Sequence, residues 1–158
     1  MPPKSVEQVL KAKRIEEIVT PKLVQASPDI SVRDAIELMQ NNKAGYIVVA
    51  KNKKVVGVFT ESDVVNKILD KDVDWSRPIS EFMTPNPKTL KLTDLVGDAI
   101  DLMGSNKFYH IPLLDDKGEL ANVLSVRTLI RFLGEFYPTE IYNLPPRPGQ
   151  VMDTPEGG

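Results

Sequence analysis

The chain has 158 residues, of which 41% are hydrophobic and 27% charged, a composition typical of a soluble globular protein. Lys plus Arg number 20 and Asp plus Glu number 22, so the net charge of −2 argues against a nucleic-acid polymer as a partner. The chain contains no cysteine, which excludes disulfides and thiolate metal sites, and no apolar run long enough to cross a membrane. We therefore expect a cytoplasmic protein that does not engage a membrane.

The N-terminal residues 1–16 are expected to hold one short helix. Ser5-Val6-Glu7-Gln8 fits a capping box, in which a serine and a glutamine three residues later each accept a hydrogen bond from the other's backbone N–H. Val9 and Leu10 then follow a helical period, which indicates an amphipathic helix ahead of the main body of the chain.

Residues 17–72 are predicted to form a unit of strand, helix, strand, strand and helix. Ser31 caps the expected first helix, which carries Asp34 in its first turn and an apolar stripe. The continuous apolar run from Tyr46 to Val49 suits a buried strand. The expected elements are a strand at 23–26, a helix from 32, strands at 46–49 and 55–59 joined by a turn at 51–53, and a helix that Thr60 opens.

A polar linker at 73–79 leads into residues 80–137, where the same unit returns. Asp34-Ala35-Ile36-Glu37-Leu38-Met39 recurs as Asp98-Ala99-Ile100-Asp101-Leu102-Met103, and Thr20-Pro21 recurs as Thr84-Pro85 at the same spacing. A repeat of this length indicates two similar modules packed on each other. The expected elements are a strand at 88–90, a helix from Thr93 or Asp94 to about Gly104, strands at 111–114 and 120–124, and a helix from Ser125 that Gly134 stops.

The proline-rich tail at 138–158 lies outside the repeats. Proline lacks a backbone donor and fixes φ, so Leu144-Pro145-Pro146-Arg147-Pro148-Gly149 suits neither a helix nor an interior strand. Two interpretations stay open: a structural arm laid over the module or over a dimer partner, and a disordered tail.

Few residues suit catalysis. His110 is the one histidine in the chain, so a histidine-rich metal site is impossible and a His-based triad has a single candidate base. No G-x-S-x-G, Walker-type or G-x-G-x-x-G sequence is present. We therefore expect a protein that binds a ligand, with no enzyme activity, no catalytic residue, no metal and no enzyme cofactor.

The most distinctive local motif runs from Gly57 to Asp63. A strand there delivers the Thr60 hydroxyl and, three residues later, the Asp63 carboxylate at the start of a helix. Such a helix start attracts phosphate, a carboxylate one turn in can accept two bonds from a ribose diol, and Gly57 lets a ring approach the strand. The alternative is a helix cap, with Thr60 at the N-cap and Asp63 compensating the helix dipole.

The duplicated order of elements resembles a tandem pair of cystathionine-β-synthase (CBS) domains, or Bateman module. The resemblance covers Ile15 to Phe136 and rests on the order, spacing and duplication of its motifs. It implies an α+β fold of two β-α-β-β-α repeats related by pseudo-two-fold symmetry. The matching residues are Ile18-Val19-Thr20-Pro21 with Phe82-Met83-Thr84-Pro85, the two Asp-Ala-Ile helices, Tyr46-Ile47-Val48-Val49 with His110-Ile111-Pro112-Leu113, and Gly57 to Asp63.

The resemblance further implies a site for an adenosine ligand. In the family, the hydroxyl and carboxylate found here at Thr60 and Asp63 hold phosphate and ribose, and a basic residue just before an apolar-proline step often faces phosphate. His110, which precedes Ile111-Pro112, occupies that position, although a partly buried histidine at a strand start is the alternative. The nucleotide-binding residues that the resemblance implies for this first site are Thr60, Asp63, Lys22, Leu23, Val24, Tyr46, Val58, His110 and Pro112.

The second repeat departs from this pattern. The register slips by one residue after the hairpin, so Ser125 keeps the hydroxyl but Thr128 replaces the carboxylate and Asn122 replaces the glycine. Arg127 either adds a phosphate contact or is solvated, and Tyr109 either lines a cleft or lies at the edge of the core. We expect the second site, at Tyr109, Ser125, Arg127 and Thr128, to be weak, differently selective or empty.

Two hypotheses follow. The first is a regulatory module that binds AMP, ADP, ATP or a related compound such as S-adenosylmethionine, forms a homodimer through its helices and acts on an unidentified partner protein. The faces Val64/Ile68 and Leu129/Leu133 either form that dimer contact or belong to the core. The second is a structural or dimerisation module that binds no ligand and recruits its partner through the C-terminal arm.

Overall fold

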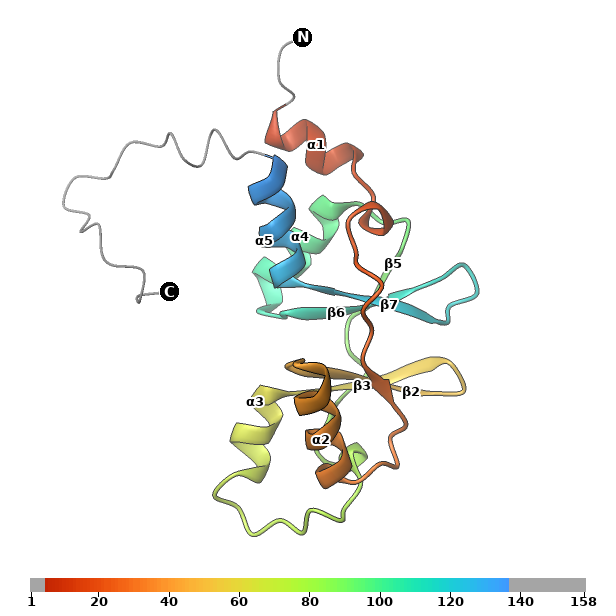
Figure 1. Ribbon diagram of the computed structural model, residues 1–158. Coiled ribbons are helices and arrows are strands. Elements are labelled where there is room, and N and C mark those ends of the chain that lie inside the picture. The colour runs from red at the N-terminus through yellow and green to blue at the C-terminus, as the bar shows by residue number, and fades with distance from the viewer. Residues whose placement is uncertain (1–4, 137–158) are drawn as a thin grey trace, which may run out of the picture.

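The computed structural model describes residues 5–136, and the predicted C-terminal arm lies outside them. The fold is α+β, with two repeated units stacked so that their sheets face each other and their helices lie on the outer sides (Figure 1). The predicted fold class and the duplication are both confirmed.

The first unit places its helices on one side of a four-stranded sheet. The strand order is β1-β2-β3-β4, with β1 parallel to β2 and the other neighbours antiparallel. The helix after β3 is a single α-turn that continues as a π-helix, η2. The elements are β1 (Gln25–Ala26), α2 (Val32–Asn42), β2 (Tyr46–Lys51), β3 (Lys54–Thr60), α3 (Glu61–Asp63), η2 (Val64–Ile68) and β4 (Thr84–Pro85).

The second unit has a three-stranded sheet in the order β5-β6-β7. Two short 3-10 helices, η1 (Ile15–Glu17) and η3 (Ile79–Glu81), precede the two units, and α1 (Val6–Ala12) opens the chain. The remaining elements are β5 (Leu90–Lys91), α4 (Val96–Asn106), β6 (His110–Leu114), β7 (Leu120–Ser125) and α5 (Val126–Phe136).

The helix starts agree with the sequence at four positions, including Thr60 before α3 and Ser125 before α5, and differ at one. Ser5 and Gln8 form the predicted capping box, and the Ser31 hydroxyl accepts a hydrogen bond from the Asp34 N–H at 3.0 Å. Helix α4 begins at Val96, later than predicted, because the Asp94 carboxylate accepts the Lys91 N–H at 2.8 Å and closes a turn ahead of the helix.

The predicted stop of the last helix at Gly134 is wrong. Helix α5 continues to Phe136, so this glycine lies inside the helix. A single glycine costs a helix interior only about 1 kcal/mol, which is too little to end an element that buries an apolar face. That face includes Leu129 and Phe132, which are buried in the second core.

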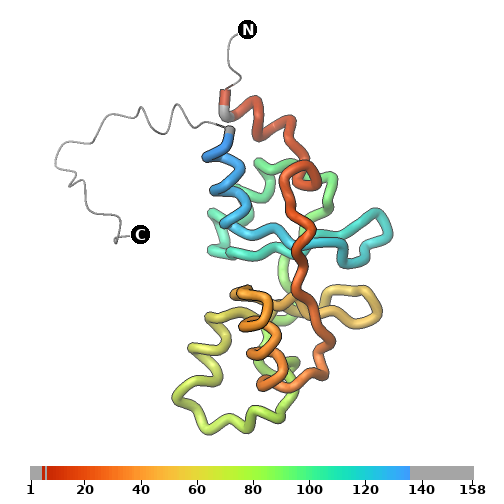
Figure 2. Tube along the Cα trace, in the orientation of Figure 1, coloured from red at the N-terminus to blue at the C-terminus, as the bar shows by residue number. Residues whose placement is uncertain are grey.

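The segment that leads into each repeat crosses to the other repeat. In the first leading segment, residues 13–22, the Ile15 N–H donates to the Asp94 carbonyl and the Lys13 carbonyl accepts the Val96 N–H, both at 2.9 Å. In the second leading segment, residues 77–86, the Ile79 N–H donates to the Ile30 carbonyl at 2.9 Å. Figure 2 shows the two leading segments passing each other between the units.

The crossing builds two mixed cores. Ile79 is fully buried in the core of the first unit, with Phe82 and Met83 packed against it, and Ile15 and Val9 are buried in the core of the second. Each unit therefore needs a segment that precedes the other in sequence, and this mutual dependence fixes the two units against each other.

Candidate functional site

A cleft of about 460 Å³ lies between the two units. Its walls come from the first leading segment, the junction of α2 and β2, the start of β6 and the junction of β7 with α5. The lining residues are Thr20, Lys22, Lys43, Ala44, Gly45, Tyr46, Glu61, His110, Val123, Ser125, Val126, Arg127, Thr128 and Arg131.

An aromatic pair stands at the inner wall of this cleft. Tyr46 and His110 occupy equivalent positions at the starts of β2 and β6, and their rings stack with centroids 4.7 Å apart and planes inclined by 30°. The Tyr46 hydroxyl accepts the Val24 N–H at 3.2 Å, and burial raises the pKa of Tyr46. Burial lowers the pKa of His110, so its ring is neutral at pH 7.

Two hydroxyls lie at the start of α5. Ser125 pairs with His110 across the β6–β7 hairpin, and its hydroxyl accepts the Thr128 N–H at 3.2 Å, as an N-cap does. The Thr128 hydroxyl is 3.1 Å from the Ser125 hydroxyl. The Val126 N–H donates to the Tyr109 carbonyl at 3.0 Å, which anchors the helix start to β6. Ser125 and Thr128 therefore contribute two hydroxyl groups to the lining of the cleft.

The first leading segment brings a lysine into the same cleft. The Asn122 side chain donates to the Thr20 carbonyl at 2.8 Å and ties this segment to β7. Lys22 follows, and its ammonium donates to the Asn42 carbonyl at the end of α2 at 2.8 Å. Lys22 thus lines the same cleft as Ser125 and Thr128, although it precedes them by a whole repeat.

The Thr60–Asp63 motif lies outside the lining of this cleft. Asp63 is 6% exposed, the most buried charged residue in the part of the chain that the structure describes. One carboxylate oxygen accepts the Thr60 N–H at 2.9 Å, and the other is 2.8 Å from the Lys67 ammonium. Lys67 also donates to the Phe82 carbonyl at 2.8 Å, so one ammonium links the carboxylate to the second leading segment.

Comparison with known sequences identifies the two units. The profile of the CBS domain matches residues 15–70 and again residues 79–135, which is more than half of the chain. The chain belongs to the CBS domain family. An uncharacterized 17.7 kDa protein of Acidianus ambivalens is 31% identical over 123 residues, which cover 77% of this chain and 74% of that relative.

A second relative is an enzyme that carries a similar part. The inosine-5'-monophosphate dehydrogenase of Methanocaldococcus jannaschii is 29% identical over 127 residues, which cover 80% of this chain but 25% of the dehydrogenase. The similarity spans a quarter of that enzyme, so it does not assign the enzyme's activity to this chain.

Solved structures confirm the tandem CBS fold. A crystal structure of a CBS domain protein superposes with a TM-score of 0.71 at 27% identity, covering 77% of this chain and 97% of that one. A CBS domain protein of Pyrobaculum aerophilum complexed with AMP gives 0.70 at 24% identity, covering 79% and 98%. A CBS pair in complex with 5'-methylthioadenosine and S-adenosyl-L-methionine gives 0.70 at 18% identity, covering 78% and 97%.

The CBS pair groups the predicted site residues differently from the sequence analysis. Residues assigned to the first site in sequence lie in the same cleft as those assigned to the second, because the leading segments cross between repeats. The cleft brings together Lys22, Tyr46, His110, Ser125, Arg127 and Thr128. Thr60 and Asp63 are not among its lining residues, and their predicted contacts to phosphate and ribose stay a prediction.

Most of the other predicted site residues are buried or partly buried. Leu23 and Val24 pack in the first core. Val58 is buried in β3 beside Thr84, and Pro112 is buried in β6 opposite Val123. Tyr109 is 59% exposed and is not among the residues that line this cleft.

The role expected for Gly57 differs from the one observed. A Cβ at this position would stand 2.9 Å from the Met83 Cγ and 3.0 Å from the Thr84 carbonyl oxygen, and closer still to the Met83 sulfur. The second leading segment therefore fills the space beside Gly57, where we expected a ligand ring to approach.

Sequence reasoning missed three charged residues of the cleft: Lys43, Glu61 and Arg131. Lys43 ends α2 in the left-handed conformation, and Glu61 begins α3 with its N–H donating to the Gly45 carbonyl at 3.1 Å. Arg131 could have been found from its spacing, since it follows Arg127 by one helical turn.

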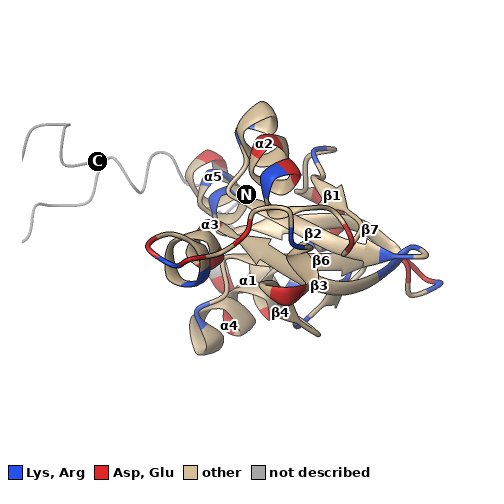
Figure 3. Ribbon diagram, turned by 90° about the horizontal axis from the view of Figure 1, so that it is seen from below, with Lys and Arg blue, Asp and Glu red and all other residues tan. Residues whose placement is uncertain are grey.

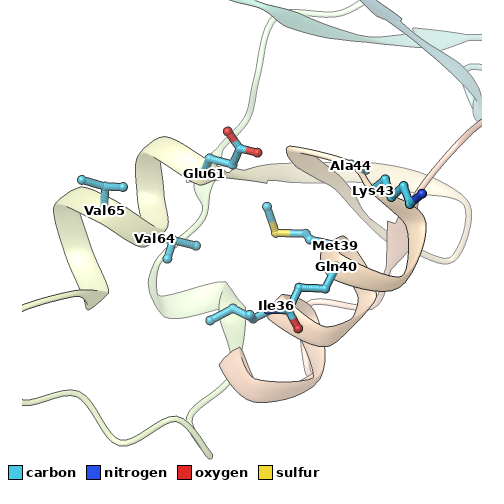
Figure 4. Close-up of a pocket in the computed structure, with 8 residues that line it drawn as sticks. All are labelled: Ile36, Met39, Gln40, Lys43, Ala44, Glu61, Val64 and Val65. Carbon is cyan, nitrogen blue, oxygen red and sulfur yellow. The ribbon is translucent and has the colours of Figure 1, made fainter.

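A separate apolar groove of about 510 Å³ lies between α2 and α3. Figure 4 shows Met39 and Val64 pointing into it from opposite sides, with Glu61 at its rim. Five of its eight lining residues are apolar, and its polar residues are Gln40, Lys43 and Glu61, of which the last two also line the inter-repeat cleft.

We also looked among the described residues for a metal site and for a membrane-spanning helix. Within residues 5–136 no group of three or more His, Asp or Glu side chains is placed to hold a metal ion. No helix in the same range is long and apolar enough to cross a bilayer. Figure 3 colours the basic and acidic positions along the ribbon, and both kinds occur in both units.

Proposed function

We propose that this chain is a regulatory module that binds an adenosine ligand in the cleft between its CBS repeats and acts on a partner protein. The observation that carries the proposal is the cleft, whose volume of about 460 Å³ suits a small molecule and whose walls come from both repeats. Related CBS pairs have been solved with AMP and with S-adenosyl-L-methionine. The candidate ligands are AMP, ADP, ATP and S-adenosylmethionine.

The residues of the cleft suggest how such a ligand is held. The Ser125 and Thr128 hydroxyls suit a sugar or a phosphate, whereas the N–H groups of Val126 and Thr128 already donate to the Tyr109 carbonyl and the Ser125 hydroxyl. The stacked rings of Tyr46 and His110 offer a flat surface and, with Tyr46 buried, little freedom to move. Thr128 stands where the first repeat has the carboxylate of Asp63. Its neutral hydroxyl therefore binds the two hydroxyls of a ribose more weakly than a carboxylate would.

A second ligand position at Thr60 and Asp63 remains part of the proposal. A ribose there would have to displace Lys67 from the Asp63 carboxylate, which would also free the Phe82 carbonyl that Lys67 holds. Binding at this position would therefore loosen the second leading segment.

A ligand in the cleft can regulate the protein because residues of both repeats line it. A ligand shifts a conformational equilibrium only through its different affinities for the two states, and a ligand in this cleft contacts both repeats at once. We propose that the ligand is bound without being transformed and that the change in repeat packing is read by a partner protein. The lack of cysteine suits action in the cytoplasm.

A homodimer fits the exposed apolar side chains of the helices. Ile68 and Leu129 are buried and Val64 and Leu133 pack against the cores, so the faces named from the sequence belong to the core. The neighbouring Val65, Leu69 and Ile130 are 59%, 47% and 65% exposed and are the better candidates for self-association.

A ligand-free structural module is the second candidate, and the Asp63 contacts favour it. The carboxylate caps Thr60 and pairs with Lys67, which accounts for its burial without any ligand. The arm through which such a module would recruit its partner lies outside the described residues.

Thermal unfolding with a panel of adenosine compounds separates the two candidates. A ligand at 100 times its dissociation constant stabilises the folded chain by about 2.7 kcal/mol, a rise in Tm of about 5–10 °C. Thr128→Asp should strengthen binding of ribose ligands about tenfold through a charge-assisted bond, and Thr128→Val serves as the matched control that removes the hydroxyl. No rise in Tm with any adenosine compound would leave the structural module as the function.

A further inference from the structure

The cleft between the repeats is strongly cationic although the chain as a whole is not. Four basic side chains line it, Lys22, Lys43, Arg127 and Arg131, against the single carboxylate of Glu61. The whole chain carries a net charge of −2, so the cleft is richer in basic residues than the chain as a whole. A concave site lined by one sign of charge raises the local concentration of ligands of the opposite sign.

Two of these cations, Arg127 and Arg131, stand four positions apart on α5. At the same spacing, Lys11–Glu7 on α1 and Lys67–Asp63 on α3 and η2 join opposite charges. Arg127 and Arg131 have the same spacing on α5 but the same charge, an unfavourable arrangement on an isolated helix. Neither guanidinium has an ion-pair partner among residues 5–136.

The spacing of the arginines defines a direction. Four residues advance an α-helix by about 6 Å, so Arg131 lies one turn beyond Arg127 and further from the Ser125 cap. A phosphate at the start of α5 would lie near Ser125 and Arg127, and Arg131 would be reached only by further phosphates. One guanidinium group can donate two parallel hydrogen bonds to one phosphate, which makes arginine well suited to bind a phosphate chain.

The first repeat and the segment that leads into it supply the other two cations, Lys22 and Lys43. Lys22 is fixed by its bond to the Asn42 carbonyl at 2.8 Å, and Lys43 follows at the end of the same helix. A ligand in the cleft therefore meets positive charge from both repeats.

We propose that the cleft selects adenosine ligands that carry two or three phosphates over AMP, and disfavours S-adenosylmethionine, whose sulfonium is a cation. The inference rests on the proposed function and names the ligand class for the same site. Arg131 is the residue that distinguishes the longer phosphate chain from the shorter one.

Isothermal titration calorimetry in buffer free of divalent cations tests this, with adenosine, AMP, ADP, ATP and S-adenosylmethionine as ligands. The wild-type chain should bind ADP and ATP about tenfold more tightly than AMP, the effect expected of one additional charge-assisted contact. Arg131→Gln should weaken ATP binding about tenfold and leave AMP binding within about twofold. Arg33→Gln, an exposed arginine on α2 outside the cleft, is the matched control and should change neither affinity.

The outcomes separate this inference from the proposed function. If AMP or S-adenosylmethionine binds as tightly as ATP, or if Arg131→Gln weakens AMP and ATP equally, the selectivity is overturned while the adenosine site stands. If none of the five compounds binds, the proposed function itself fails.

Discussion

Replacing Gly57 with alanine tests how the second leading segment packs against the first hairpin. Gly57 in β3 pairs with Pro85 in β4, and a Cβ there would stand 2.9 Å from the Met83 Cγ and 3.0 Å from the Thr84 carbonyl oxygen. The Met83 side chain must turn away to make room, and the Thr84 carbonyl, which belongs to the backbone, presses the second leading segment away from β3.

Two opposing effects set the size of the change. Overpacking a tight contact costs about 1–3 kcal/mol, and exchanging glycine for alanine gains about 0.4–1 kcal/mol by restricting the unfolded chain. We expect the free energy of unfolding to fall by about 1–2 kcal/mol and the Tm by about 3–6 °C for a chain of this size.

Urea denaturation followed by circular dichroism measures this loss, with Gly104→Ala as the matched control. No atom lies within 4 Å of a Cβ at Gly104, which is inside α4, so this alanine should stabilise the chain by about 0.5–1 kcal/mol. Combining Gly57→Ala with Met83→Ala should cost less than the sum of the two single changes, since the clashing side chain is then gone. A Gly57→Ala protein as stable as Gly104→Ala would refute the crossed packing of the leading segments.

Three further predictions concern stability and assembly. Asp63→Ala should lower the free energy of unfolding by about 1–2 kcal/mol through loss of a cap, and Lys67→Met should also lower it, because it leaves the buried Asp63 carboxylate without its ion-pair partner; an Asp63→Ala protein as stable as the wild type in urea titrations would contradict the cap. Burial lowers the pKa of His110, so the unfolded chain binds its proton more readily and stability should fall as the pH drops below about 6.5. His110→Phe should remove that part of the pH dependence between pH 7 and pH 5, and an unchanged dependence would be inconsistent with a buried neutral ring. Val65→Ser combined with Ile130→Ser should convert a dimer to a monomer in light scattering with little loss of stability; a wild-type monomer would contradict the proposed dimer face.

The elements that depend on local signals were predictable from the sequence. Ser5 and Ser31 cap helices where expected, and the apolar run at Tyr46 forms a buried strand of the first sheet. Caps and periodicity act over a few residues, so one sequence carries them. The duplication then extended these assignments from the first repeat to the second.

The arrangement of the site was not predictable in the same way. The family resemblance groups Lys22 with Thr60 in one site, yet Lys22 lines the cleft with Ser125 and Thr128, and Thr60 does not. The bond from Asn122 to the Thr20 carbonyl that places it joins residues 102 positions apart. Contacts at such separation depend on topology, and no local pattern encodes which repeat a leading segment joins.

The contacts of Asp63 were predictable from the sequence only in part. The spacing of Asp63 and Lys67 is that of a helical ion pair and could have been read from the sequence. The second bond of Lys67, to the Phe82 carbonyl, could not, because it joins the first repeat to the second leading segment. The sequence thus allowed both a cap and a ligand site at Asp63, and the observed contacts use both oxygens of its carboxylate.

The most direct test of the central proposal is an amide NMR titration of the chain with ATP and AMP. Ligand in the inter-repeat cleft should shift the backbone signals of Lys22, Tyr46 and His110 together with those of Ser125 and Thr128. This set joins residues of both repeats and does not arise from binding to one repeat alone. Saturable shifts at these positions would support the proposal, and signals that stay unchanged at millimolar ligand, or that move only outside the cleft, would contradict it.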